Sequence, residues 1–372
     1  MRLLLAGGGT AGHITPAIAV AEELLKKSRN SDILFIGRND GNENRIIESS
    51  GFELKTLRIK GLKRSLSPEN IKRIRDAFTA KRDAEEIIRE FKPDVVLGTG
   101  GYVCWPVLAA AKKLGIPTAI HESNAFPGLT TRLLAKSCDR VFLGVGEAKK
   151  YLGKGVRSFV VGNPLRQDLV RTSRCEARRS LNLKENDVFI LSFGGSIGAE
   201  KLNETIGEVM KIHSSRIENL KHLHGCGQRY YDDIESEFKG KGKSGCRIIP
   251  YINNMPTMLR AADIVICRSG AMTLSEIAQV GVASILIPSP NVSGNHQLKN
   301  AIHLSHQGAA IMIEEDKLSA DLLINHLSEL ENDKNGRKNR AKILHTLSNP
   351  NAAKLIVEEL FLLKNTSKRA VF

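Results

Sequence analysis

Short apolar runs alternate with segments of helical spacing along almost the whole chain. The runs are rich in Leu, Ile and Val and mostly stop at glycines or small polar residues, as buried strands do. We predict strands at 3–6, 33–37, 94–97, 118–120, 140–143, 188–193, 221–226, 246–252, 262–267 and 283–288. Helical segments between the strands favour parallel pairing. Because the strand–glycine turn–helix pattern starts afresh near residue 188, we predict an α/β fold of two doubly wound Rossmann-like domains.

The clearest of these repeats is the stretch 262–281. Its strand is cut by Arg-Ser-Gly, and the next helix is expected to span 271–280 and to end at Gly281. This arrangement aims the positive end of a helix at the carboxyl edge of the sheet, where a nucleotide diphosphate would bind. Glu276 could hold a ribose diol there. The alternative is a capping box that pairs Glu276 with Thr273.

The first strand leads into a second candidate nucleotide turn. Gly7, Gly9 and Gly12 match the G-x-G-x-x-G pattern of dinucleotide-binding domains, and a helix is expected at 16–25. That pattern also calls for an acidic residue at the end of the next strand. The chain has Arg38 there, which would suit the 2′-phosphate of NADP, so an NADP-dependent oxidoreductase is one hypothesis.

Residues 71–82 form a basic amphipathic segment. Ile71, Ile74 and Phe78 fall on one stripe of the predicted helix, with lysines and arginines beside and behind it. The ordinary interpretation is a surface helix that buries this stripe in the core. The functional alternative is a peripheral membrane contact made by an apolar tip and a basic flank.

The best domain boundary is the Gly-Asn-Pro link at 162–164. At 372 residues, the chain is too long for one ordinary core. We therefore expect an N-terminal domain over 1–163, a C-terminal domain over 164–342 and a final segment over 343–372. Apolar spacing in the final segment predicts a helix that could pack back on the first domain.

Composition limits the classes of partner that the chain is expected to bind. The formal net charge of +15 implies an anionic partner, which could be nucleic acid, an acidic membrane surface or a phosphorylated substrate. Nucleic acid is disfavoured because zinc-finger spacing is lacking and aromatic residues make up only 5% of the chain. No apolar run is long enough to span a membrane or form a signal peptide, so a cytoplasmic location is expected. The six scattered cysteines suit reduced thiols.

Six turns taken together resemble one family. In chain order they are 8–13 (GGTAGH), 96–103 (VLGTGGYV), 121–124 (HESN), 161–166 (VGNPLR), 194–199 (GGSIGA) and 267–276 (CRSGAMTLSE). Their order and spacing resemble the MurG-type bacterial cell-wall transferases, which move N-acetylglucosamine (GlcNAc) from UDP-GlcNAc to undecaprenyl-diphospho-muramoyl-pentapeptide. The resemblance implies a GT-B fold, in which an N-terminal acceptor domain and a C-terminal donor domain face a cleft.

Carried over position by position, the resemblance also implies the substrate contacts. On the donor side it implies Arg166 and Ser196 at the diphosphate, Ile252 beside the uracil and Gln297 at the GlcNAc hydroxyls. The nucleotide-binding turn would comprise Ala271, Met272, Thr273, Leu274, Ser275 and Glu276, with Glu276 on the ribose. On the acceptor side, the residues implied are Thr10, Ala11, Gly12, His13 and Asn124.

The reaction that the resemblance implies is an inverting in-line displacement by the muramoyl C4 hydroxyl. His13 is the candidate base, because a nearby helix N-terminus should keep its imidazole neutral, and Glu122 is the alternative. The chain lacks an Asp-x-Asp metal motif. We therefore expect no metal and no cofactor, with backbone N–H groups and Arg166 stabilising the departing UDP.

Two further functional alternatives stay open. One is a GT-B glycosyltransferase that acts on another lipid or a small aglycone, and the other is a non-enzymatic module that binds a sugar nucleotide. The resemblance also implies a peripheral position at the cytoplasmic face of the inner membrane, where anionic lipids would attract the basic chain.

Overall fold

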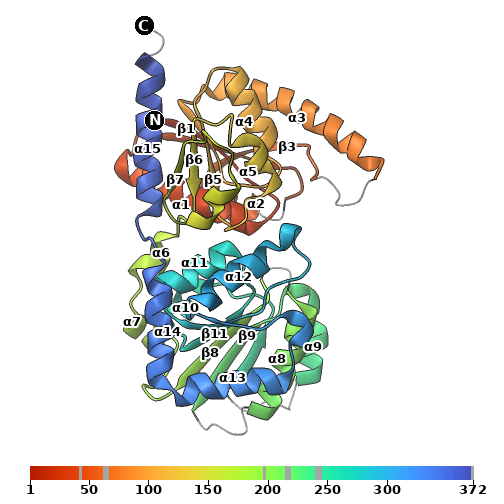
Figure 1. The fold of residues 1–372 in the computed structure, drawn as a ribbon, viewed down its shortest axis with the longest axis vertical. Helices are drawn as coiled ribbons and strands as arrows, with labels where there is room; N and C mark the ends of the chain where they lie inside the picture. Colours follow the sequence, from red (N-terminus) through yellow and green to blue (C-terminus); the bar gives the residue numbers. More distant parts are fainter. Residues whose placement is uncertain (42–43, 62–66, 196–197, 214–218, 239–244, 370–372) are drawn as a thin grey trace. The chain divides into compact units, whose positions relative to one another are not determined.

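The computed structural model describes residues 1–41, 44–61, 67–195, 198–213, 219–238 and 245–369 (Figure 1). It divides into two compact units. Unit 1 comprises Met1–Arg166 and Asn349–Phe372, and unit 2 comprises Gln167–Ser348. The chain therefore enters unit 2 three residues later than the sequence predicted, and it returns to unit 1 after Ser348.

Unit 1 is built on a seven-stranded parallel sheet of order β3-β2-β1-β4-β5-β6-β7. The strands are β1 (Arg2–Ala6), β2 (Asp32–Arg38), β3 (Glu53–Leu57), β4 (Val95–Gly98), β5 (Thr118–Glu122), β6 (Arg140–Leu143) and β7 (Ser158–Val160). In β1, Leu3 and Leu5 join one apolar cluster, whereas Leu4 and Ala6 join another. Because successive side chains point to opposite faces, the sheet is buried on both sides.

Helices cover both faces of this sheet (Figure 1). They are α1 (Ala11–Lys27), α2 (Asn44–Ser49), α3 (Glu69–Phe91), α4 (Cys104–Lys113), α5 (Leu129–Leu134), the 3-10 helix η1 (Gly146–Tyr151) and α15 (Ala352–Arg369). Helices α1 and α15 pack against each other and share one apolar cluster, while α3 and α4 pack together in the other. Ile356, Val357 and Leu360 of α15 are fully buried in this way, which fixes the C-terminal helix to unit 1.

Helix α3 is buried along its C-terminal half only. Its buried side chains are Ala80, Ala84 and Ile88. In its N-terminal half, Ile71 is 74% exposed, and Ile74 and Phe78 are also exposed. The interpretation that this stripe is buried in the core is therefore wrong.

Unit 2 repeats the architecture with a six-stranded parallel sheet of order β10-β9-β8-β11-β12-β13. The strands are β8 (Val188–Phe193), β9 (Leu220–Gly225), β10 (Cys246–Ile249), β11 (Ile264–Cys267), β12 (Ala283–Leu286) and β13 (Ile311–Met312). The α-helices are α6 (Gln167–Arg171), α7 (Arg174–Ser180), α8 (Glu200–His213), α9 (Tyr231–Phe238), α10 (Met255–Ala261), α11 (Ala271–Val280), α12 (His296–His306), α13 (Ala320–Asn332) and α14 (Lys334–Thr346). Short 3-10 helices lie at η2 (Gln228–Tyr230), η3 (Ser293–Asn295) and η4 (Glu315–Lys317).

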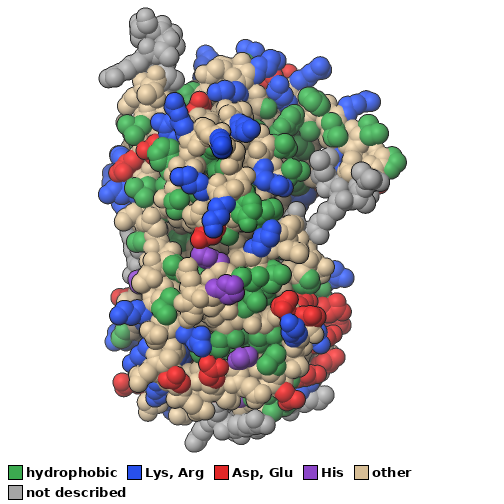
Figure 2. All heavy atoms as spheres, viewed as in Figure 1, with side chains coloured by type: hydrophobic (Ala, Val, Ile, Leu, Met, Phe, Trp, Pro, Cys, Tyr) green, Lys and Arg blue, Asp and Glu red, His purple; other side chains and the backbone are tan. Residues whose placement is uncertain are grey.

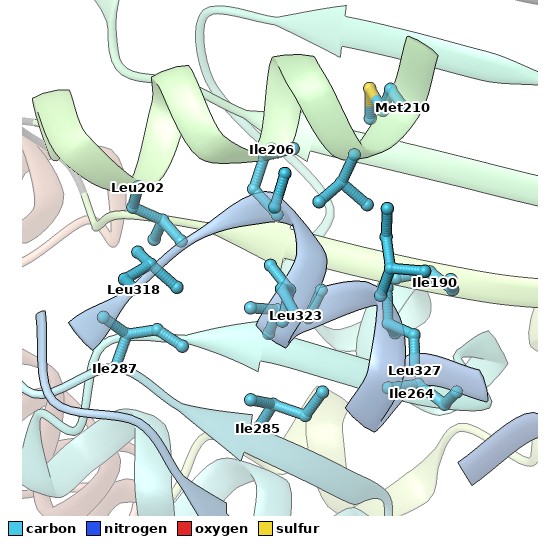
Figure 3. Packing of buried hydrophobic residues seen from close by; sticks show 14 of the residues in the cluster. Ile190, Leu202, Ile206, Met210, Ile264, Ile285, Ile287, Leu318, Leu323 and Leu327 are labelled. Atoms are coloured by element: carbon cyan, nitrogen blue, oxygen red, sulfur yellow. The ribbon is translucent and has the colours of Figure 1, made fainter. Parts of the chain in front are cut away.

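One apolar cluster of unit 2 lies between one face of its sheet and the helices α8 and α13. Figure 3 shows Leu202, Ile206 and Met210 of α8 packed with Leu323 and Leu327 of α13 and with the strand residues Ile190, Ile264 and Ile285. The two doubly wound parallel sheets that the sequence predicted are thus confirmed. None of the described helices has an apolar stretch of the length that a bilayer span requires.

Candidate active site

In unit 1, the candidate site residues begin at the turn between β1 and α1. Helix α1 begins at Ala11 rather than at residue 16, so Gly12 and His13 lie in its first turn, next to exposed Thr10. The Nδ1 atom of His13 lies 2.9 Å from the carbonyl oxygen of Gly8. A carbonyl oxygen only accepts, so Nδ1 donates, and the neutral ring keeps its lone pair on Nε2. In this tautomer the ring can take up a proton at Nε2.

The turn after β4 closes over the His13 ring. Gly100 and Gly101 have φ angles of +115° and +84°, a region that favours glycine. A Cβ atom on Gly100 would lie 2.5 Å from Cδ2 of His13, and one on Gly101 would lie 2.0 Å from the Gly8 oxygen. The Thr99 hydroxyl donates to the His13 carbonyl oxygen at 2.7 Å. Two glycine turns therefore fix the ring, and the role of Thr99 is one that sequence reasoning missed.

Glu122, at the end of β5, is a buried carboxylate with all its hydrogen bonds made locally. One oxygen accepts from the backbone and side-chain nitrogens of Asn124, each at 3.0 Å. The other accepts from the Gly128 amide at 2.9 Å and from the Thr131 hydroxyl at 2.7 Å. The carboxylate thus orders the loop that carries Asn124. This use of both oxygens favours His13 over Glu122 as the base.

Other polar residues close to Glu122 form hydrogen bonds at the same edge of the sheet. His121 is fully buried and its Nε2 donates to the Gly162 oxygen at 3.1 Å. Burial lowers the pKa of His121 to about 4, although the Gly162 bond opposes this, so the ring is neutral. The Asn163 amide donates to the Ser123 oxygen at 3.2 Å. Arg166 is exposed at the last position of unit 1 before the crossing to unit 2.

In unit 2, helix α11 spans 271–280 and ends at Gly281 with φ +67°, which confirms both predicted features. The N-cap residue before the helix is Gly270, and no side chain caps this end. Thr273 therefore lies within the first turn instead of preceding the helix. Since the capping box would need Thr273 at the N-cap, that alternative is wrong.

Glu276 lies one turn further along α11 and is half-buried. Burial raises the pKa of the Cys267 thiol, and the negative charge of Glu276 adds to the rise. Because β11 ends at Cys267 and α11 begins at Ala271, the opening turns of α11, which carry Glu276, follow the carboxyl end of that strand. The helix start and this carboxylate therefore belong to one edge of the unit 2 sheet.

The other residues of the predicted nucleotide-binding turn, 271–275, differ in how deeply their side chains are buried. Met272 and Leu274 are buried, while Ala271, Thr273 and Ser275 are half-buried. The two buried side chains belong to the core. A ligand at the helix start would therefore contact the backbone of these residues, where the first N–H groups have no partner within the helix.

Ile252 is also buried, with its side chain against Gly225 at the end of β9, where an added Cβ would lie 2.9 Å from it. Ser196 lies outside the described residues. Gly198, two residues further along the same turn, has φ +84°, and a Cβ there would lie 2.3 Å from the Cys226 oxygen. This close packing explains the glycine at that end of the turn.

The start of α12 is tied to the end of β11. The Ser269 hydroxyl donates to the Gln297 carbonyl oxygen at 2.9 Å, and the Asn300 amide donates to the Ser269 oxygen at 3.3 Å. The side-chain oxygen of Gln297 accepts from the Ser289 amide at 2.9 Å. Gln297 is thus held at the same sheet edge as Glu276.

Arg268 fastens the loop that leads to α12. Its guanidinium donates to the carbonyl oxygens of Ile287 and Pro288, at 3.2 and 3.3 Å, and pairs with Glu315. The sequence pattern did not indicate a role for Arg268. A charged residue directly after a buried strand was the signal that could have identified it. Among the described residues, no cluster of His, Cys, Asp and Glu has the arrangement of a metal site.

Comparison with known proteins covers both units. The N-terminal domain of glycosyltransferase family 28 matches residues 3–143, and the C-terminal domain of that family matches residues 189–356. The UDP-N-acetylglucosamine–N-acetylmuramyl-(pentapeptide) pyrophosphoryl-undecaprenol N-acetylglucosamine transferase of Acetivibrio thermocellus is 40% identical over 358 residues, which is 96% of this chain and 97% of that protein. The protein of the same name from Thermoanaerobacter sp. is 45% identical over 89% of this chain and 91% of its own. The crystal structure of Acinetobacter baumannii MurG is 26% identical, with a TM-score of 0.73 over 96% of this chain and 98% of that one.

Proposed function

The chain belongs to glycosyltransferase family 28, among its UDP-N-acetylglucosamine–N-acetylmuramyl-(pentapeptide) pyrophosphoryl-undecaprenol N-acetylglucosamine transferases, and from this premise we propose how it acts. It transfers GlcNAc from UDP-GlcNAc to the C4 hydroxyl of undecaprenyl-diphospho-muramoyl-pentapeptide in peptidoglycan synthesis. This function is supported above all by the sequence similarity of both units, over 89–96% of the chain, to relatives that bear this name. A different lipid or aglycone acceptor, an NADP-dependent activity and a non-enzymatic binding module are not favoured, because those relatives match 89–96% of the chain.

Unit 2 binds the donor in this proposal. The start of α11 offers N–H groups and the positive end of a helix to the diphosphate. Glu276 accepts hydrogen bonds from the ribose hydroxyls, and Gln297 contacts the GlcNAc. Ile252 borders the uracil, and Arg166 and Ser196 contact the diphosphate. The Arg268 pairing with Glu315 supports this role, because it keeps the loop before Gln297 in place.

Unit 1 binds and activates the acceptor. The proton of the C4 hydroxyl passes to Nε2 of His13 as the hydroxyl oxygen bonds to the anomeric carbon and the bond to UDP breaks. The Nδ1 bond to Gly8 supports this assignment, since it keeps the proton-accepting lone pair on Nε2. Asn124 faces the sugar from the loop that Glu122 orders, and Thr10, Ala11 and Gly12 line the turn. Donors from the start of α11 and from Arg166 stabilise the charge that develops on UDP.

We also propose that unit 1 binds the anionic cytoplasmic face of the membrane. Unit 1 has 32 Lys and Arg against 19 Asp and Glu, so it carries +13 of the net charge of +15. Exposed Ile71, Ile74 and Phe78 form the apolar stripe of α3, and exposed Lys72 and Arg75 flank it. Apolar and basic side chains intermingle over the part of Figure 2 that corresponds to α3 and α4 in Figure 1. An apolar stripe with basic flanks suits an interfacial contact.

A panel of nucleotides tests the donor assignment. We expect UDP-GlcNAc and UDP to raise the melting temperature of the protein, because a ligand that binds only the folded state stabilises it. NADPH at the same concentration should leave the melting temperature unchanged. Stabilisation by NADPH without stabilisation by UDP would instead support the oxidoreductase hypothesis.

A further inference from the structure

A cavity of about 370 Å³ opens on unit 1 away from the candidate active site. Its lining residues are Lys112, Gly115, Ile116, Pro117, Asp139, Arg140, Arg157, Leu363 and Thr366. Pro117, Asp139 and Arg157 directly precede β5, β6 and β7, so the cavity lies at the amino edge of the sheet. The glycine turns follow β1 and β4, and Glu122 is the last residue of β5, so all of them lie at the opposite edge of the same parallel sheet.

Positive charge predominates in this cavity. Three of its lining residues are cations, Lys112, Arg140 and Arg157, against one carboxylate, Asp139. That carboxylate is already engaged, because one oxygen accepts from the Thr118 amide at 2.8 Å and the other lies 3.3 Å from the Lys112 ammonium. The cavity can therefore receive a further negative charge.

The two arginines differ in their partners. Arg140 is held by Glu359 of α15, with 3.2 Å between its Nε and the carboxylate. Arg157 is exposed and forms no ion pair within the described part of the chain. A guanidinium presents a planar fork of N–H donors that matches phosphate oxygens. Arg157 is thus the donor group available to an anion.

The remaining walls make the cavity suitable for an organic anion. Ile116, Pro117 and Leu363 are apolar, and Leu363 and Thr366 belong to α15, which closes one side. Apolar walls strengthen the attraction between a bound anion and nearby cations, because they exclude water. We propose that this cavity binds the phosphate group of a phosphorylated small molecule or of a lipid headgroup, with Arg157 as the principal ligand and Lys112 and Arg140 beside it.

Phosphate binding to two charge-reversal variants tests this proposal. Inorganic phosphate is titrated against the full chain with UDP at saturation, so that the donor site is filled, and at constant ionic strength. We expect saturable stabilisation in the wild type and at least about tenfold weaker binding in Arg157→Glu, because a charge-assisted contact is replaced by repulsion. Lys154→Glu is the matched control, because Lys154 is exposed on the same loop and does not line the cavity.

The variants also distinguish the two sources of phosphate. If the natural ligand is a lipid, Arg157→Glu will bind phosphatidylglycerol vesicles more weakly than Lys154→Glu does. If it is a soluble metabolite, both variants will bind vesicles equally, while sn-glycerol 3-phosphate binding is lost only in Arg157→Glu. The proposal is overturned if phosphate fails to saturate the wild type or binds both variants equally well. Transfer activity without added phosphate should be the same in all three proteins.

Discussion

His13 shows how a single ring acquires a defined chemical role. A carbonyl oxygen on one side fixes the proton on Nδ1, and the glycines at 100 and 101 leave room for the ring on the other. The sequence identified His13 as a candidate from its place beside a glycine turn. It did not reveal the tautomer or the packing, because Gly100 and Gly101 are remote in sequence and meet His13 only in the fold.

Replacing His13 tests its role as the base. In His13→Ala, we expect kcat to fall by about 10²- to 10⁴-fold, because the acceptor hydroxyl loses its proton acceptor. The KM for UDP-GlcNAc should change little. His306→Ala, an exposed histidine on α12, is the control and should keep wild-type kcat. Near-normal turnover of His13→Ala, measured as UDP release, would exclude this base.

Glu122→Gln separates a structural role from a catalytic one. The glutamine side chain keeps one oxygen and replaces the other with an NH₂ group. That NH₂ group faces either the Gly128 and Thr131 donors or the Asn124 donors, and those buried donors lose their hydrogen-bond acceptor. We expect the free energy of unfolding to fall by about 1–3 kcal/mol. Trp105 is the chain's one tryptophan and lies in unit 1, so its fluorescence during urea unfolding provides the measurement. Unchanged stability with a 100-fold loss of kcat would instead favour Glu122 as the base.

Glu276→Gln tests ribose binding. Loss of charge-assisted hydrogen bonds should raise the Kd for UDP-GlcNAc by about 10- to 100-fold. The melting temperature without ligand should stay near that of the wild type, because Gly270, and no side chain, caps α11. Unchanged affinity, measured by calorimetry, is the result that would exclude the ribose contact.

At the scale of elements, the sequence predicted the bounds of a helix correctly where the local signals at its ends were strong. The bounds of α11 agree with the prediction because a strand break and a left-handed glycine mark its ends. The start of α1 was misplaced because Pro16 suggested a first helical turn. The helix begins at Ala11, where the Thr99 hydroxyl and the Gly8 oxygen hold the His13 residue. Contacts between distant residues, which the sequence pattern does not display, therefore set that boundary.

The exposed stripe of α3 carries the prediction for membrane binding. We expect Ile74→Glu/Phe78→Glu to bind anionic vesicles at least about tenfold more weakly, because two apolar side chains no longer enter the interface. Wild-type binding should also weaken as salt is raised, since salt screens the attraction of basic side chains to lipid. Leu355→Glu/Leu362→Glu places the same double change at exposed positions of α15 and should retain binding. Equal binding by both variants in a flotation assay would contradict the proposed surface.

At the scale of the whole molecule, the sequence predicted two similar sheets and a basic chain. Most of the charge asymmetry is already present in the sequence, because residues 1–166 carry +11, and the return of α15 adds only +2, which gives +13 for unit 1 and +2 for unit 2. The sequence did not show a buried polar chain in unit 2. There the Ser192 hydroxyl lies 2.8 Å from both His222 and His224, and His224 donates to Asn203 at 3.0 Å.

These buried histidines predict acid lability. Burial lowers the pKa of His121 and His224 to about 4 and places that of His222 well below its usual value. Unfolded histidines titrate near 6.5, so the unfolded state binds more protons between about pH 6.5 and 4. The contribution of these neutral rings to the free energy of unfolding is therefore fully present above about pH 6.5. It falls on acidification, by up to about 1.4 kcal/mol per pH unit for each histidine.

Urea unfolding at pH 7.5, 6 and 5 measures this dependence. We expect the free energy of unfolding to decrease at each step. His306→Ala should show the same slope, because that histidine is exposed in the native protein. A flat profile between pH 7.5 and 5 would mean that the buried rings do not stay neutral in the folded chain.

The most direct test of the central claim is the product balance with both substrates present. Purified protein is incubated with UDP-GlcNAc and undecaprenyl-diphospho-muramoyl-pentapeptide, and the released UDP and the lipid-linked disaccharide are quantified together. We predict one UDP for each disaccharide formed and no UDP release when the lipid acceptor is omitted. Failure to form the disaccharide, or equal UDP release with and without the acceptor, would contradict the proposed transferase activity.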